Sequence, residues 1–169
     1  AILASAFSSL NATRVSIRNH IYTATTSNFT RGAGLHISDS SAFFTECDIS
    51  SNEAKNVYGT SSNHNPKAEG AGIYSINSTI RLVDSTVNDN LCRAWANTYQ
   101  SSFVSRGAGI YAGVSSDITI IDSEISRNQV YAPISVFGGG IYCDDTGSSI
   151  IISNTLMLYN EANDGSAIY

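Results

Sequence analysis

GAGIY at residues 70–74 and again at 107–111 belongs to a pentapeptide that recurs along the chain, as GAGLH at 32–36, GGGIY at 138–142 and GSAIY at 165–169. The first glycines of successive copies are 38, 37, 31 and 27 residues apart. A period that drifts in this way indicates a fixed structural unit followed by a connection of variable length. The pentapeptide therefore predicts a repeat protein.

A second marker follows each of the first four pentapeptides at a nearly constant distance. It is an apolar residue, two further residues and an asparagine, and it begins 17, 17, 18 and 19 positions after the first glycine. Its copies lie at 49–52, 87–90, 125–128 and 157–160. The alternating apolar residues between the two markers, as in Ile80–Leu82, are typical of a short β-strand.

These repeats favour an all-β fold, a right-handed single-stranded parallel β-helix. Each unit supplies three short strands with turn residues between them, and no segment has the 3.6-residue apolar periodicity of a helix. A single unit cannot bury its apolar side, so the copies stack and build a continuous core. The right hand follows from the usual chirality of parallel crossovers.

Residues 1–169 are expected to form one β-helix domain of about five rungs. The rungs are predicted at 1–31, 32–69, 70–106, 107–137 and 138–164, with the next one starting at 165. Variable loops on one flank are predicted at 53–69, 91–106, 129–137 and 161–164. Because solenoids cover their open ends with caps, we expect the repeats to be an excerpt of a longer array.

Stacking places equivalent residues of successive rungs in columns. One inward column is aliphatic, with the members Leu35, Ile73, Ile110, Ile141 and Ile168. A column at a turn consists of the marker asparagines Asn52, Asn90, Asn128 and Asn160. We expect the asparagines to form a structural ladder, in which the side-chain amides bond to one another and to the backbone.

The two markers resemble the GGA[ILV] and FxxN repeats of the chlamydial polymorphic outer-membrane proteins. Gly165–Ile168 (GSAI) and Met157–Asn160 (MLYN) come close to those motifs, whereas GAGI in place of GGAI and Ile, Val or Met in place of Phe depart from them. The resemblance implies a β-helix of the pectin-lyase-like superfamily on a cell surface or in a secreted assembly, often as a passenger or adhesin. It carries over no catalytic residue.

A column of tyrosines is the first candidate for a binding site or interface. Tyr74, Tyr111, Tyr142 and Tyr169 share one position of the repeat, with His36 in the rung before them. If the ring faces are open, such a row can stack on sugar rings or hold a neighbouring chain. The alternative is that the rings stack on one another under the long loops and only stiffen the sheet.

An acidic column is the second candidate. Glu46, Asp84 and Asp122 each lie three residues before the apolar residue of the second marker. Carboxylates about 4.8 Å apart suit Ca²⁺ binding or acid–base chemistry on a polysaccharide. Arg14 and Asn154 take this place in other rungs. However, the Arg or Lys that would support such chemistry is missing nearby, and Asp before Ser is an ordinary choice for a turn. A polysaccharide lyase or glycoside hydrolase of the pectin-lyase-like fold is the alternative function that rests on these residues.

Three sequons, at Asn11, Asn28 and Asn77, are candidates for N-glycosylation in a secreted eukaryotic chain. The three cysteines form neither a metal-ligand spacing nor an even disulfide set. We expect no metal and no cofactor, apart from the Ca²⁺ that the acidic column leaves open.

The charge and the apolar pattern exclude two classes of partner. A net charge of −5 argues against nucleic acid, and without a long apolar run we expect no membrane insertion within this segment. Together with the resemblance, the repeats predict a non-catalytic structural or adhesive module that is extracellular or at the cell surface. Its expected partners are other protein chains of an extracellular assembly, or surface carbohydrate.

Overall fold

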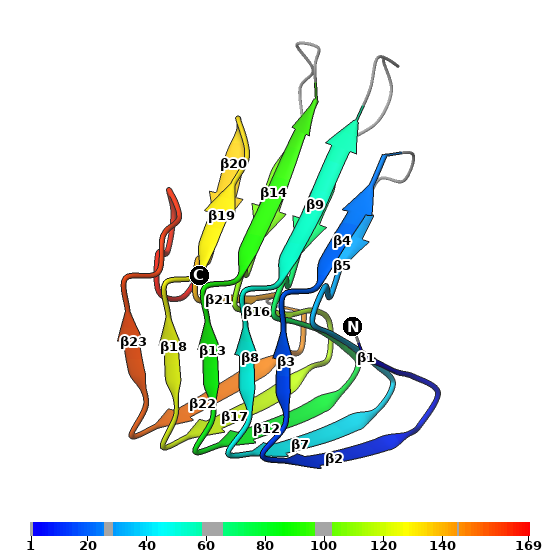
Figure 1. The fold of residues 1–169 in the computed structure, drawn as a ribbon, viewed down its shortest axis with the longest axis vertical. Coiled ribbons are helices and arrows are strands. Elements are labelled where there is room, and N and C mark those ends of the chain that lie inside the picture. Colours follow the sequence, from blue (N-terminus) through cyan, green and yellow to red (C-terminus); the bar gives the residue numbers. More distant parts are fainter. Residues whose placement is uncertain (1, 26–28, 59–65, 97–102, 145) are drawn as a thin grey trace.

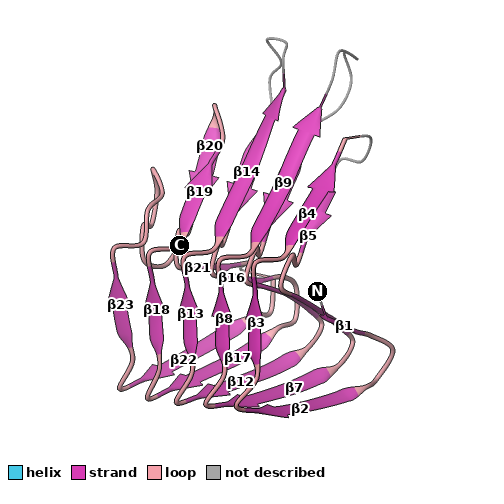
Figure 2. Cartoon of the chain, viewed as in Figure 1, coloured by secondary structure: helices cyan, strands magenta, loops and turns pink. Residues whose placement is uncertain are grey.

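A computed structural model gives the architecture of residues 2–25, 29–58, 66–96, 103–144 and 146–169. These residues form 23 β-strands joined by turns and bends, without an α-helix (Figure 2). Their strands all pair in parallel, each with the equivalent strand of a neighbouring coil. The chain therefore winds into a right-handed parallel β-helix, as the repeats predict (Figure 1).

Three sheets enclose the body of the solenoid (Figure 1). Sheet A contains β1 (Ile2–Ala4), β6 (Leu35–Ser38), β11 (Ile73–Ile76), β16 (Ile110–Ala112) and β21 (Ile141–Cys143). Sheet B contains β2 (Ser9–Thr13), β7 (Ser41–Thr45), β12 (Thr79–Val83), β17 (Asp117–Ile121) and β22 (Ser149–Ser153). Sheet C contains β3 (Ser16–Arg18), β8 (Asp48–Ser50), β13 (Thr86–Asn88), β18 (Glu124–Ser126) and β23 (Leu156–Leu158).

Two further sheets form an arm that projects from the body (Figure 1). Sheet D contains β4 (Ile21–Ala24), β9 (Glu53–Tyr58), β14 (Leu91–Ala96) and β19 (Gln129–Tyr131). Sheet E contains β5 (Phe29–Arg31), β10 (Lys67–Glu69), β15 (Val104–Arg106) and β20 (Ser135–Phe137). In each of the first four coils, the chain runs outward along a strand of sheet D and returns along a strand of sheet E.

The arm corrects the expectation for this flank. The segments predicted as loops at 53–69, 91–106 and 129–137 begin and end as strands, so a full coil has five strands rather than three. The two sheets pack on a second core of small residues, which includes Ala54, Ala68, Cys92, Ala94, Ala132 and Val136. Alanines bury little apolar surface each, so their alternation is a weak sequence signal for a strand, although it lets two sheets approach closely.

The body core contains the predicted aliphatic column, except for Ile168 in the last coil, which is 44% exposed. Leu35, Ile73, Ile110 and Ile141 are consecutive partners in sheet A, and all four are fully buried. The inward residues of sheets B and C, such as Ile118 and Ile125, complete the same cluster. Like residues thus lie over one another from coil to coil, which is the property on which the repeat interpretation depends.

The first glycine of the pentapeptide is required by the turn from sheet E into sheet A. Gly70 has φ +59°, and a Cβ placed on it would lie 2.4 Å from the carbonyl oxygen of Ile73. Glycine is the residue that adopts this left-handed conformation without a steric penalty. Gly32, Gly107, Gly138 and Gly165 have positive φ values in the same turn of the other coils.

The second glycine of the pentapeptide is required by the asparagine ladder. A Cβ on Gly72 would lie 2.5 Å from the carbonyl oxygen of Gly109 and 2.9 Å from the side-chain nitrogen of Asn90. Gly34, Gly109 and Gly140 have the same contact with Asn52, Asn128 and Asn160. The two sequence markers are therefore the two sides of one close contact inside each coil.

The asparagine ladder runs through four coils. The side-chain nitrogens of Asn52, Asn90 and Asn128 each donate, at 3.0 Å, to the side-chain oxygen of the next asparagine. That oxygen also accepts the preceding asparagine's backbone N–H at 3.0–3.1 Å. Each side-chain nitrogen also donates to a backbone carbonyl of the preceding coil, as Asn90 does to Ile49 at 3.0 Å. The ladder satisfies polar groups that are sealed from water.

Candidate functional site

The tyrosine column forms a continuous stack on the outer face of sheet A. Ring centroids lie 5.1 Å apart between Tyr74 and Tyr111, 5.2 Å between Tyr111 and Tyr142, and 5.5 Å between Tyr142 and Tyr169, with interplanar angles of 5–8°. His36 continues the column at 4.8 Å from Tyr74, with its ring tilted by 46°. The parallel register of sheet A imposes this arrangement, because it sets equivalent residues side by side.

The middle of this column is closed to solvent. Tyr74 and Tyr111 are 2% and 6% exposed, Tyr142 is half-buried, and Tyr169 in the last coil is exposed. The faces of Tyr74 and Tyr111 are already occupied by neighbouring rings, as in the alternative in which the column stiffens the sheet. Their cover comes from sheet E rather than from overlying loops.

The cover is a column of long side chains on the adjoining face of sheet E. Arg31, Glu69, Arg106 and Phe137 are consecutive partners there. The guanidinium carbon of Arg31 lies 5.1 Å from the ring centroid of Tyr74, and that of Arg106 lies 5.0 Å from the ring centroid of Tyr142. Cations over aromatic faces are attracted by the ring quadrupole. The corner between sheets E and A, where these side chains cover the tyrosines, therefore joins the arm to the body.

Glu69 is the charged residue at the centre of the corner. It is 2% exposed, and its carboxylate lies 2.9 Å from Nε of Arg31 and 3.9 Å from a terminal nitrogen of Arg106. A buried carboxylate is tolerated when cations and hydrogen bonds compensate its lost hydration. No repeat pattern in the sequence predicts a role for Glu69. The available signal was its position just before Gly70, where the neighbouring coils place Arg31 and Arg106.

Burial raises the pKa of Tyr74 and of Tyr111, and the charge of Glu69 adds to the rise at Tyr111. Unfolded tyrosine ionises near pH 10, so the unfolded state loses protons at a pH at which these buried phenols keep theirs. The contribution of these two phenols to the free energy of unfolding is therefore fully present below about pH 10, and it is lost as the pH rises above that value.

We expect an absorbance titration at 295 nm to show a late phase that coincides with loss of the β-sheet circular dichroism signal. The Tyr74→Phe, Tyr111→Phe double variant should lose this phase, and protein in concentrated denaturant should show a single phase near pH ~10. A native protein whose tyrosines all ionise in one phase, before unfolding, would contradict the closed stack.

The acidic column lies at the turn from sheet B to sheet C. Arg14, Glu46, Asp84, Asp122 and Asn154 occupy equivalent positions, and all five have φ between +46° and +55°. Asp and Asn accept this left-handed conformation more readily than most residues do, which accounts for three of the five. The column is exposed to solvent along its length.

Two carboxylates of this column, those of Glu46 and Asp122, have partners in a neighbouring coil. Glu46 accepts a hydrogen bond from Arg14 at 2.8 Å, and this guanidinium lowers the pKa of Glu46. Asn154 donates to Asp122 at 2.5 Å. The described ranges contain no group of three or more His, Cys, Asp or Glu residues that could hold a metal ion. The structure thus places the three candidate carboxylates in one column, at turns where their side chains face solvent.

Two of the three sequon asparagines are exposed. Asn11 lies on β2, and Asn77 lies at the turn between sheets A and B with φ +49°. Asn77 donates to the carboxylate of Asp39 at 2.5 Å, and this bond, together with one from Ser38, lowers the pKa of Asp39. Asn28 lies outside the described residues.

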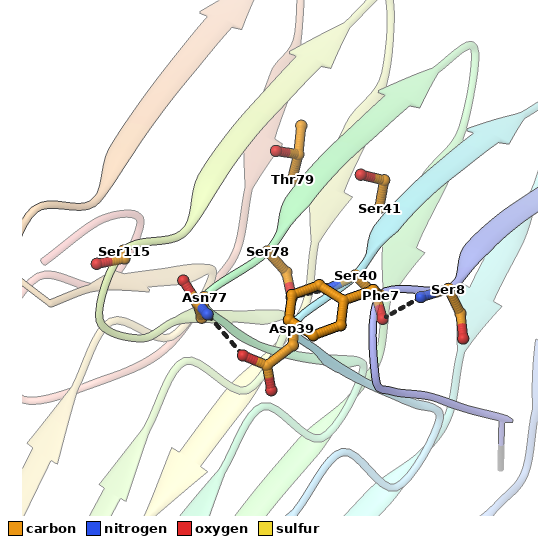
Figure 3. A pocket seen from close by; sticks show the side chains of 9 residues that line it. All are labelled: Phe7, Ser8, Asp39, Ser40, Ser41, Asn77, Ser78, Thr79 and Ser115. Carbon is orange, nitrogen blue, oxygen red and sulfur yellow. Dashed lines mark hydrogen bonds between the residues drawn. The ribbon is translucent and has the colours of Figure 1, made fainter.

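Asn77 also lines a shallow groove of ≈ 410 Å³ at this turn (Figure 3). Phe7 lies over the groove, and most of the other lining side chains are hydroxyl groups. The backbone N–H of Ser8 donates to the Ser40 hydroxyl at 3.2 Å, and the N–H of Ser40 donates to the Ser78 hydroxyl at 3.1 Å. These serines are a second coil-to-coil ladder, so the floor of the groove is part of the scaffold.

The cysteines pack without disulfides. Cys47, Cys92 and Cys143 are free thiols, and Cys92 is sealed in the arm core, where burial raises its pKa. A thiol with a raised pKa is a poor nucleophile. Its surroundings are those of a small buried apolar residue.

Within the described ranges, no helix is long and apolar enough to cross a membrane.

No protein-family model matches this chain, and neither a curated protein nor a solved structure matches it. The likeness of its repeats to those of the polymorphic outer-membrane proteins therefore stays a prediction.

Proposed function

We propose that this chain is a non-catalytic structural or adhesive module of a secreted or cell-surface protein, within a larger extracellular assembly. The observation that carries the proposal is that the repeated polar and aromatic side chains bind one coil to the next. Asn52, Asn90 and Asn128 bond to the next coil, and Tyr74 and Tyr111 stack on it. Ladders of this kind hold each coil to the next and make a stiff rod, which suits a spacer or stalk.

The acidic column supports the same proposal over the enzymatic alternative. Glu46 is paired with Arg14, and the candidate carboxylates stand at exposed turns. General acid catalysis on a glycosidic bond needs a carboxyl group whose pKa is raised, usually by burial in an apolar pocket. For Glu46 the pKa is lowered instead.

Incubation with acidic polysaccharides and Ca²⁺, followed by assays for reducing ends and unsaturated products, tests this proposal. We expect the chain to release no more product than a buffer blank. The Asp84→Asn and Asp122→Asn substitutions preserve the turn, so both variants should fold. They should release the same amount of product as the unmodified chain. Cleavage by the unmodified chain that either variant abolishes would establish the polysaccharide-active enzyme instead.

The location has a separate test. Antibody labelling of intact source cells, compared with permeabilised cells, should detect the protein on the intact surface or in the medium. Signal confined to permeabilised cells would contradict an extracellular module.

A further inference from the structure

The outer face of the arm has an aromatic groove that none of the columns above includes. It has a volume of ≈ 460 Å³ and is lined by Leu91, Arg93, Trp95, Gln129 and Tyr131. The first three lie on β14 and the other two on β19, and these strands are neighbours in sheet D (Figure 1). The residues point away from the arm core, because Cys92, Ala94 and Val130, which alternate with them, point into it.

The register of the two strands places the groove's rings on a diagonal. Leu91 is the partner of Gln129 and Arg93 is the partner of Tyr131. Trp95 lies two residues beyond Arg93 on the same face of β14. The rings of Trp95 and Tyr131 are therefore diagonal neighbours on adjacent strands. Arg93 and Gln129 supply hydrogen-bonding groups beside the rings.

The two rings stay open to solvent, unlike those of Tyr74 and Tyr111. Trp95 is 38% exposed and Tyr131 is 57% exposed. Lys55 on the adjacent strand β9 lies over one side of Trp95, with its nitrogen 5.7 Å from the ring centroid. The ammonium group thus helps to fix the orientation of the indole. An ordered, accessible pair of rings is suited to stacking on a flat ligand.

The charges around the groove largely cancel. Arg93 lies 3.0 Å from the carboxylate of Glu53, and Lys55 and the exposed Glu161 stand at the neighbouring coils of sheet D. A charged ligand would have to displace Glu53 from Arg93 or meet its carboxylate. This balance favours a neutral ligand that has both a flat apolar face and many hydroxyl groups.

We propose that this groove binds a neutral hexopyranose oligosaccharide through stacking on Trp95 and Tyr131. Pyranose rings present an apolar face of C–H groups to aromatic rings, while their hydroxyls hydrogen-bond to groups such as Arg93 and Gln129. A stable protein interface needs about 800 Å² from each partner, far more than a groove lined by five side chains offers. The inference rests on the adhesive role proposed above, and it names the ligand class of that role.

The sole tryptophan of the chain lies in the groove, so tryptophan emission, excited at a wavelength that tyrosine does not absorb, reports on this site alone. Cellotetraose and β-1,4-galactotetraose are the neutral probes, each titrated to about 20 mM, which saturates a site of millimolar affinity. We expect a saturable change in tryptophan emission with at least one of them. Tetragalacturonic acid should bind more weakly, since Arg93 is already paired with Glu53.

Tyr131→Ala should raise the dissociation constant about tenfold, because it removes one of the two stacking partners. Phe43→Ala is the matched control: Phe43 is 39% exposed, much like Trp95, but lies on the outer face of sheet B. It should leave the dissociation constant unchanged. For Trp95→Ala, titration calorimetry should detect no binding, with the circular dichroism spectrum retained.

Three outcomes would overturn the inference: no emission change with either neutral probe, binding of the uronate alone, or a change that follows protein concentration and so marks self-association. Each of them leaves the non-catalytic proposal standing. Conversely, binding followed by release of shorter saccharides would refute the non-catalytic proposal and keep the site. The two failures are therefore distinguishable in the same samples.

Discussion

Replacing Asn90 with alanine is expected to lower the free energy of unfolding by about 4 kcal/mol, because buried groups left without a partner cost roughly 1–3 kcal/mol each. The side chain is fully buried. Its loss takes an acceptor from the backbone N–H and side-chain nitrogen of Asn52, and a donor from the carbonyl of Ile49. Urea unfolding at constant m-value is the measurement.

Two further variants show whether the ladder is the cause. Asn90→Asp keeps an acceptor for Asn52 but donates nothing to Ile49 or Asn128, so it should also destabilise. Asn11→Ala removes an exposed asparagine from β2 and should change the free energy of unfolding by less than about 0.5 kcal/mol. If Asn90→Ala were as mild as Asn11→Ala, the ladder would contribute little to the fold.

Replacing Glu69 with alanine is expected to cost about 3–5 kcal/mol, the usual effect of removing one partner from a buried ion pair. The substitution removes the carboxylate between Arg31 and Arg106, and leaves the two guanidinium groups with aromatic rings as partners. These rings are Phe29 and Tyr74 for Arg31, and Phe137 and Tyr142 for Arg106. Glu69→Gln preserves the shape and one acceptor, so it should cost less. Thermal and urea unfolding of the three proteins measure the difference.

Glu46→Ala is the control for this effect, because Glu46 is also paired with an arginine but at an exposed turn. Exposed ion pairs are screened by water and salt and contribute little. We expect the midpoint of Glu46→Ala to match that of the unmodified protein. Equal effects of the two substitutions would mean that burial adds nothing to the Glu69 pair.

The fold is readable in the sequence because its tightest contacts tolerate few residues. Gly70 has to be glycine for its backbone conformation, Gly72 for the approach of Asn90, and Asn90 for a buried amide with donors and an acceptor. Such positions recur in the four coils that begin at residues 32, 70, 107 and 138, so the markers and the aliphatic residues between them predict the parallel β-helix.

The arm is less readable, for a physical reason. The strands at 53–58 and 91–96 bury only small side chains, those of Ala54 and Asn56 and those of Cys92 and Ala94. This alternation differs little from that of a surface loop. Propensity and apolar pattern therefore gave no strand there, although backbone pairing between coils forms one. The groove at Trp95 was missed with it, because a lone tryptophan in a presumed loop carries no pattern.

The burial of the tyrosine column could not be predicted from one repeat position alone. It depends on Arg31, Glu69 and Arg106, which precede the pentapeptide by one residue and fold back over the rings from sheet E. The asparagine ladder needed no such information, because its partners are its own copies in the next coil.

The central claim is that successive copies of the repeat lie directly over one another, and methyl NOE spectroscopy tests it most directly. In protein labelled at isoleucine δ1-methyl groups, with resonances assigned by single Ile→Val substitutions, we predict cross-peaks from Ile73 to Ile110 and from Ile110 to Ile141. The Ile73–Ile141 cross-peak should be weak or absent, since two strand steps separate those residues by about 9.6 Å. Absence of both neighbour cross-peaks, with the three isoleucines contacting other partners, would contradict the stacked solenoid.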